Sequence, residues 1–231
     1  MRNCKTKFTS EDNNVSSANQ LKDSKKIFFL GNENAKKRIL IVGNSITRHG
    51  VKEEIGWHGD FGMAASSIEK DYVHLLAADI LKKEDAYIMV HQLADWERTY
   101  TEDNALSLWE ADRAFSPDLM IFRLGENMPA LQTDAEQEAL EASLFSVVKH
   151  LSLEKKKIVL TTSFWKKPRV DAAITNVANA LGMPIVPLGD LGDDEKFMAV
   201  GLFEHVGVAH HPGDLGMQKI AERIFCAIEN L

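Results

Sequence analysis

The stretch ILIVGNSITRHG, residues 39–50, joins four consecutive aliphatic residues to a glycine and a short polar segment. A run without polar alternation is typical of a strand buried on both faces, as in a parallel sheet that helices cover on both sides. Asn44 and Ser45 are therefore expected at the carboxyl end of this strand. Open parallel sheets collect their ligands at that end, so the stretch predicts both a fold class and the place of a site.

Five apolar runs of this kind occur along the chain. They cover residues 38–43, 86–93, 118–124, 157–164 and 184–188. Helical patterns separate them, with apolar residues three and four positions apart. These cover residues 67–83, 134–152, 169–182 and 215–230. Strands that alternate with helices predict an α/β fold, here a three-layer α/β/α sandwich around a five-stranded parallel sheet.

Two of the helical patterns are preceded by a possible capping box, in which a Ser or Thr and an acidic residue three positions later satisfy the first N–H groups. The pairs are Ser66 with Glu69 and Thr133 with Glu136. They predict helix starts close to residues 67 and 134.

The composition describes one globular domain. The chain has 231 residues, of which 45% are hydrophobic and 26% charged, which is typical of a soluble protein of this size. Residues 1–36 differ, because they are polar apart from the apolar island IFFL at 27–30. We expect an N-terminal extension over 1–36, flexible or packed on a sheet edge, and a single domain over 37–231.

The charge and the cysteines narrow the classes of partner. A net charge of −7 disfavours a nucleic-acid partner, which needs a basic surface. Cys4 and Cys226 match no metal-ligand spacing and suit a reducing compartment. No apolar run has transmembrane length and the first residues lack a signal-peptide pattern. We therefore expect a cytoplasmic protein without a membrane partner.

The predicted loops hold the groups that acyl transfer needs. A serine attacks an acyl carbon when a base removes its proton and N–H donors stabilise the oxyanion. Ser45 follows the first strand, Gly62 offers a backbone N–H from a long loop, Asn127 offers a side-chain amide after the third strand, and His211 precedes the last helix. Each residue alone also fits an ordinary structural role, such as a turn or a cap.

Taken in order, VGNSIT, GDFGMAAS, RLGENMP and HHPGDLGM resemble the four sequence blocks of the SGNH hydrolases, also called GDSL esterases. The resemblance extends over about residues 38–230. It implies a flavodoxin-like sandwich and hydrolysis of acyl esters without a metal or cofactor. Ser45 would be the nucleophile and His211 the general base and then acid. The oxyanion hole would combine the Ser45 N–H, the Gly62 N–H and the Asn127 side chain.

Two positions depart from the family pattern. Asn44 replaces the usual aspartate before the serine, and Val208 stands three residues before His211, where the family has the aspartate that orients the ring. Loss of such a carboxylate from a triad that depends on it costs on the order of 10⁴ in turnover. A backbone carbonyl within 207–209 or the side chain of Glu204 could take its place, and both alternatives stay open.

Two neighbours of His211 have simpler interpretations. Asp214 lies three residues after His211, but it stands where the last helix needs an N-cap. His210 is interpreted as a rim or hydrogen-bonding residue, because the His-Pro pair of the family pattern selects His211.

The substrate is less well determined. Trp57 and Phe61 flank Gly62, and Trp165 follows the fourth strand; such aromatics either stack on a sugar or pack a loop. Arg123, beside Glu126, either contacts substrate or forms a structural ion pair.

No long apolar lid segment is evident, so we expect a short acyl group, such as acetyl, on a carbohydrate or glycoconjugate ester. The alternatives are a lysophospholipase or thioesterase of the same family, and a non-catalytic glycan-binding domain suggested by Val208.

Overall fold

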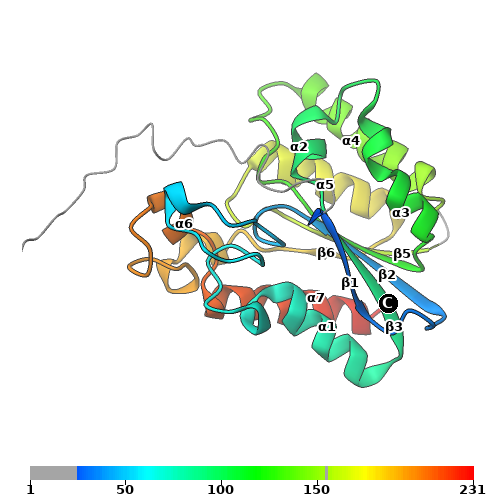
Figure 1. Cartoon of the computed structure of the whole chain (residues 1–231). Helices are drawn as coiled ribbons and strands as arrows, with labels where there is room; N and C mark the ends of the chain where they lie inside the picture. Colours follow the sequence, from blue (N-terminus) through cyan, green and yellow to red (C-terminus); the bar gives the residue numbers. More distant parts are fainter. Residues whose placement is uncertain (1–24, 154–155) are drawn as a thin grey trace, which may run out of the picture.

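A six-stranded sheet lies at the centre of the computed structural model, which describes residues 25–153 and 156–231 (Figure 1). The strand order is β1-β3-β2-β4-β5-β6. The bounds are β1 (Ile27–Gly31), β2 (Lys37–Gly43), β3 (Ala86–Gln92), β4 (Leu119–Arg123), β5 (Lys157–Thr161) and β6 (Ile185–Val186). Strands β2 to β6 are parallel, which confirms the five predicted strands.

The apolar island forms a sixth strand. Residues 27–31 form β1, which pairs antiparallel with β3 at the edge of the sheet, with Ile27 opposite His91 and Gly31 opposite Tyr87. The predicted boundary at residue 36 would place this strand outside the domain, although it belongs to the sheet. Of the two interpretations of the N-terminal extension, the island therefore follows the one that packs it on a sheet edge, with β3 as its partner. Residues 1–24, including Cys4, lie outside the described residues.

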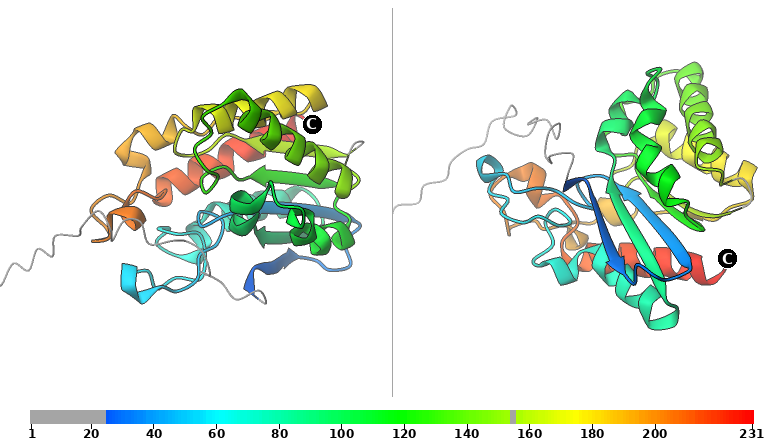
Figure 2. Two further views of the ribbon diagram at one scale, coloured as in Figure 1. Left: turned by 90° about the horizontal axis from the view of Figure 1, so that it is seen from above. Right: turned by 45° about the vertical axis from the view of Figure 1, so that its right-hand side comes forward.

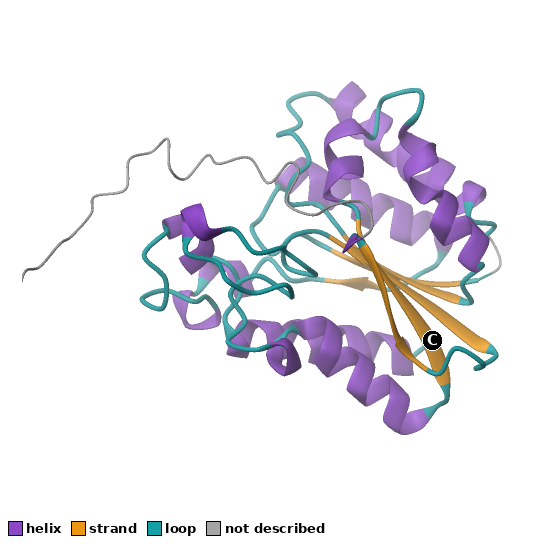
Figure 3. Ribbon diagram, viewed as in Figure 1, coloured by secondary structure: helices purple, strands orange, loops and turns teal. Residues whose placement is uncertain are grey.

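Helices cover both faces of the sheet (Figures 1 and 3). Helices α1 (Tyr72–Lys83) and α7 (Asp214–Glu229) pack together on one face. The other face carries α2 (Ala94–Thr99), α3 (Glu110–Phe115), α4 (Asp134–His150) and α5 (Pro168–Leu181). Short 3-10 helices cover Glu53–Ile55, Ile68–Lys70, Ala105–Trp109, Leu191–Asp193 and Glu195–Phe197, and α6 (Val206–Ala209) is a single turn.

Alternation along each strand separates two hydrophobic cores. In β2, Leu40 and Val42 pack toward the face of α4 and α5, whereas Ile39 and Ile41 pack toward α1 and α7. Successive side chains of a strand point to opposite faces, so an aliphatic run without polar residues fills both cores at once. This is the three-layer sandwich that the sequence predicted.

One predicted capping box is confirmed. The Thr133 hydroxyl accepts from the Glu136 N–H, and the Glu136 carboxylate accepts from the Thr133 N–H, at the start of α4. The prediction for α1 is wrong, because that helix begins at Tyr72 with Asp71 as its N-cap. Residues 68–70 form a separate 3-10 turn instead.

The N-cap expected at Asp214 is also wrong. Gly213 is the N-cap of α7. The carboxylate of Asp214 instead accepts from the N–H and hydroxyl of Ser66, at 2.8 and 2.7 Å, and from Lys70. It therefore ties the start of α7 to the segment that precedes α1.

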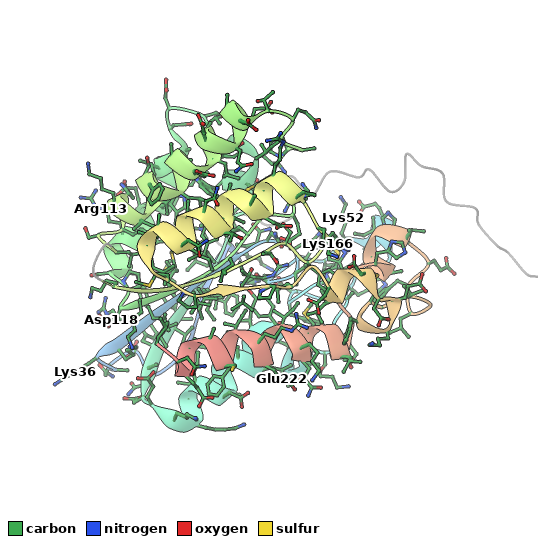
Figure 4. The ribbon with its side chains drawn as sticks, turned by 180° about the vertical axis from the view of Figure 1, so that it is seen from behind. Lys36, Lys52, Arg113, Asp118, Lys166 and Glu222 are labelled. Carbon is green, nitrogen blue, oxygen red and sulfur yellow. The ribbon has the colours of Figure 1, made fainter. Side chains whose placement is uncertain are left out.

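The long loops gather at one end of the sheet. Figure 4 shows Lys52 and Lys166, on the loops after β2 and β5, at one end of the molecule, and Lys36 and Asp118 at the opposite end. The chain passes from β2 to β3 on one side and later reaches β4 on the other side, and ligands bind at such a switch point. The view from above in Figure 2 shows the loop-rich end projecting beyond the strands.

No helix within residues 25–153 and 156–231 is both long and apolar enough to cross a bilayer.

Candidate active site

The structure brings Ser45 and His211 together across 166 residues of sequence. The Ser45 Oγ lies 3.0 Å from the His211 Nε2, and Ser45 is only 7% exposed. Ser45 sits in a tight turn directly after β2, in which the N–H groups of Thr47 and Arg48 both donate to the Asn44 carbonyl at 2.9 Å. The end of β2 and this turn together fix the position of the serine.

A backbone carbonyl holds the histidine. The His211 Nδ1 lies 2.6 Å from the Gly207 carbonyl oxygen, which can only accept, so the ring proton is on Nδ1. The Nε2 is then the acceptor for the Ser45 hydroxyl. Of the two alternatives left open by the sequence, the carbonyl is the one found, and Glu204 is an exposed residue that does not occupy Nδ1.

The side chain of Val208 is apolar and cannot orient the His211 ring. It is completely buried and packs in a small cluster beneath the site with Trp57, Met63, Ala64 and Ala199. The short helix α6 turns the Gly207 carbonyl toward the ring, and the His211 N–H donates to the Val208 carbonyl at 3.0 Å. The orienting group has thus moved from a side chain to the neighbouring main chain.

Burial keeps both histidines near the serine neutral. It lowers the pKa of His211 to about 3, against the opposing effect of the Gly207 carbonyl, and the nearby His49 lowers it further. Burial likewise lowers the pKa of His49 to about 4, while the bond from its Nδ1 to the Gly50 carbonyl, 2.6 Å long, raises it. The indole of Trp165 packs edge-on against His211, with ring centroids 4.8 Å apart, and contributes to this desolvation.

These two histidines predict that the protein is less stable in acid. In the unfolded chain both bind a proton near pH 6.5, but in the folded protein only near pH 4 and 3. Lowering the pH from about 7.5 to about 5.5 therefore favours the unfolded chain. The free energy of unfolding should fall by roughly 1 kcal/mol for each histidine, measured by urea denaturation at the two pH values. His49→Gln and His211→Gln should each remove about half of this difference, and equal stability at both pH values would contradict it.

The structure does not support the role predicted for the Gly62 N–H. This N–H donates to the Asp71 carboxylate at 3.1 Å. A Cβ at residue 62 would meet the Ile46 carbonyl oxygen at 2.6 Å and the Asp71 Cβ at 2.9 Å. Gly62 is therefore required for close packing between this loop and the N-cap of α1.

The next residue in the chain contacts the serine instead. The Met63 N–H donates to the Ser45 carbonyl at 3.0 Å. Ala64 follows in the left-handed region, with φ +73, a conformation that costs a residue with a side chain about 1–2 kcal/mol. Within the part of the chain that the structure describes, the buried Ala64 N–H donates to no other group. Ala64 thus replaces Gly62 as the candidate donor, and strained backbone of this kind is typical of functional sites.

Asn127 is held by a carboxylate that the sequence did not single out. Its Nδ2 donates to the Glu97 Oε2 at 2.6 Å. The Glu97 Oε1 accepts from the N–H groups of Gly125 and Asn127, at 2.6 and 3.3 Å, and from the Asn44 Nδ2 at 3.1 Å. Burial and the nearby charge of Glu126 raise the pKa of Glu97, whereas these N–H donors lower it.

Arg123 belongs to the same network. It is 1% exposed, and its guanidinium bonds both Glu126 oxygens, at 2.5 and 3.2 Å, and the Asn44 Oδ1 at 2.9 Å. The Phe164 N–H donates to Glu126 at 2.8 Å. Of the two interpretations of Arg123, the structural ion pair is the one observed.

The aromatic candidates differ in position. Trp57 is 2% exposed, and its Nε1 donates to the His49 carbonyl at 3.2 Å. Phe61 packs edge-on against it, with centroids 5.2 Å apart. Both residues hold the loop after β2 together. Trp165 is half-buried beside His211, and its Nε1 donates to the His210 carbonyl at 3.3 Å, so it is the aromatic that borders the reacting groups.

The sequence did not indicate Glu97, Asp71 or Arg98, whose Nη2 donates to the Asn127 Oδ1 at 3.3 Å. Glu97 and Arg98 lie in the six-residue helix α2, which is too short to give a helical pattern. Asp71 stands in a charged string, EKD, that looks exposed. Within residues 25–153 and 156–231, no group of three or more His, Cys, Asp or Glu side chains is arranged to hold a metal ion.

This chain resembles known proteins in its structure and not in its sequence. No family model and no curated protein matches the sequence. A lipase/acylhydrolase from Enterococcus faecalis superimposes with a TM-score of 0.57 and 15% identity, over 84% of this chain and 96% of that one. For a protein described as a GDSL-like lipase from Bacteroides ovatus the values are 0.53 and 14%, over 85% and 100%.

A two-domain esterase active on acetylated mannans also matches, with a TM-score of 0.54 and 16% identity, over 84% of this chain and 48% of that one. At such identities the likeness concerns the fold. The chain has the fold of the GDSL-type, or SGNH, hydrolases.

Proposed function

We propose that this protein is a serine esterase that hydrolyses short acyl esters, acetyl esters above all, of a carbohydrate or glycoconjugate. One observation carries the proposal. The Ser45 hydroxyl faces the unprotonated Nε2 of His211 at 3.0 Å, while the Gly207 carbonyl holds the opposite ring nitrogen. A nucleophile within hydrogen-bond reach of an oriented base is the arrangement that acyl transfer requires.

In the acylation step, the Ser45 Oγ attacks the ester carbonyl carbon and its proton passes to the His211 Nε2. The carbonyl oxygen becomes an oxyanion. We assign its stabilisation to the Ser45 N–H, the Ala64 N–H and the side-chain amide of Asn127. Donors aimed at the developing charge in a buried site contribute about 3–4 kcal/mol each to lowering the barrier.

Collapse of this intermediate expels the alcohol, which takes the proton from His211 and leaves an acyl group on Ser45. A water molecule then gives its proton to the same Nε2 and attacks the acyl carbon. The second collapse releases the acid and returns the proton to the Ser45 oxygen. The imidazolium formed in each step is stabilised by a neutral carbonyl rather than a carboxylate, so we expect slower turnover than for a full triad.

The acetyl-carbohydrate preference rests on two observations. The esterase active on acetylated mannans shares the fold, and Trp165 borders His211 with part of its indole exposed. An aromatic face beside the reacting groups can stack on a sugar ring. An acyl chain longer than a few carbons would favour the lysophospholipase or thioesterase alternative instead.

The test combines substrates with a covalent probe. Purified protein should hydrolyse p-nitrophenyl acetate faster than the octanoate ester, and it should release acetate from acetylated xylo- or manno-oligosaccharides. A fluorophosphonate should add one phosphonyl group to Ser45, with loss of fluoride, as seen by peptide mass spectrometry. The exposed Ser146→Ala variant on α4 is the matched control and should be labelled like the wild type, whereas Ser45→Ala should not.

Three outcomes separate the alternatives. Rates that rise with acyl length would favour a lysophospholipase or thioesterase. A protein that hydrolyses no ester and takes no label at Ser45, but binds the oligosaccharides, would support the glycan-binding domain. Labelling without acetyl release from any sugar would remove the carbohydrate part of the proposal and leave the esterase.

A further inference from the structure

Glu97 is a buried carboxylate in an unusual position. It is fully buried on α2, and among the residues that the structure describes four N–H groups bond it, all from the loops after β2 and β4. Four N–H donors on one carboxylate satisfy most of its acceptor capacity. Burying a charge is costly unless it is hydrogen-bonded in this way. The stability of buried Glu97 therefore depends on the positions of these two loops.

Both ends of the Asn127 side chain are fixed by charged groups. The Nδ2 donates to Glu97 at 2.6 Å, and the Oδ1 accepts from the Arg98 Nη2 at 3.3 Å. Exchange of the amide oxygen and nitrogen would place the oxygen against a carboxylate and the NH₂ group against a guanidinium. Charge therefore selects one orientation of the amide, and the N–H bonded to Glu97 sets the direction of the second N–H on the same nitrogen.

We propose that Glu97, assisted by Arg98, is a positioning residue that orients the Asn127 side-chain amide toward the oxyanion. This proposal rests on the esterase function proposed above. Neither residue touches the reacting atoms. They act through Asn127, because preorganised donors are effective only if their direction is held before the charge develops.

The residue before the nucleophile fits the same interpretation. The Asn44 Nδ2 donates to Glu97 at 3.1 Å and to the Glu126 Oε2 at 2.5 Å. An aspartate at position 44, as the family pattern has it, would set a third carboxylate against these two. Asn44 and Glu97 are therefore matched to each other. The negative charge usually carried beside the serine lies on α2 in this chain, with the Arg123 guanidinium bonded to Asn44 and Glu126.

The kinetic test uses Glu97→Gln, which keeps the shape but replaces one acceptor by a donor. We expect kcat for p-nitrophenyl acetate to fall about 10- to 100-fold, as for other supporting residues, and KM to change less than about threefold. The exposed Glu102→Gln removes the same charge nearby and should behave as wild type. In an Asn127→Ala background, Glu97→Gln should cause no further loss, because coupled residues are not additive.

A purely structural Glu97 gives a different pattern. Its effect would persist in the Asn127→Ala background, and this result or an unchanged kcat would overturn the proposal. If Glu97→Gln does not fold, Arg98→Gln takes its place, since it loosens the other end of the amide. It should lower kcat by a smaller factor that also vanishes in Asn127→Ala.

A readout independent of turnover separates failure of this proposal from failure of the esterase function. The side-chain NH₂ signals of Asn127, assigned by their loss in Asn127→Ala, should shift downfield and exchange slowly in ¹⁵N spectra of the wild type. Glu97→Gln should abolish both properties, and Glu102→Gln should not. Unchanged Asn127 signals in Glu97→Gln would overturn the proposal even in a protein that hydrolyses no ester.

Discussion

His211→Ala is expected to lower kcat for p-nitrophenyl acetate by about 10⁴-fold or more, with little change in KM. The variant loses the group that accepts the Ser45 proton and later returns it to the leaving alcohol, so the interaction lost exists only in the transition state. Loss of the base in serine hydrolases has effects of this order. Steady-state kinetics on the purified variant, with thermal unfolding to show that it is folded, is the measurement.

His210→Ala is the matched control for this variant. His210 is exposed, and its bonds to Val206 and Trp165 are made by its main-chain N–H and carbonyl, so removal of its ring should change kcat less than about threefold. A loss below tenfold in His211→Ala would exclude His211 as the general base. The loss should also exceed that of Glu97→Gln by at least a hundredfold, because one residue transfers protons and the other only orients an amide.

Val208→Asp should destabilise the fold strongly and should not increase activity. It restores the residue type of the family pattern, but it buries a carboxylate in the apolar cluster of Trp57, Met63 and Ala199. An unpaired buried charge costs about 3–5 kcal/mol. For a chain of this length that corresponds to a fall in Tm of roughly 10 °C or more, measurable by thermal unfolding.

Val208→Thr is nearly the same size and uncharged, so its Tm should fall by clearly less than that of Val208→Asp. If Val208→Asp kept the wild-type Tm and raised kcat, the carboxylate would have displaced the Gly207 carbonyl from His211. That result would show that the main-chain orientation is not a fixed part of the fold.

The strands of the sheet could be predicted because their side chains face two cores. The aliphatic residues of β2 show this without any neighbour, and the Thr133–Glu136 pair marks the start of α4 through purely local bonds. The start of α1 could not be predicted in this way. Ser66 is a good local cap, but Asp214, distant in sequence, binds it, and Asp71 caps the helix instead.

In the candidate site, too, some residues could be predicted from local sequence and others could not. Ser45 and Asn127 follow strands, so their meeting with His211 at one end of the sheet follows from topology. The donor from the second block could not be assigned from sequence, because a glycine can serve packing or catalysis. Here Gly62 packs against Ile46 and Asp71, while Ala64 adopts the left-handed conformation. Glu97 and the Gly207 carbonyl required the tertiary structure, since neither α2 nor a main-chain oxygen leaves a pattern.

The antiparallel strand β1 bears on how the protein should be handled. It covers the outer edge of β3, which would otherwise present a row of unpaired N–H and C=O groups to other molecules. Trimming the chain to begin at residue 37, where the predicted domain starts, would remove that cover from a strand whose residues are almost all buried. Strand β1 thus protects the sheet against edge-to-edge pairing with other copies of the protein, and recombinant versions should keep it.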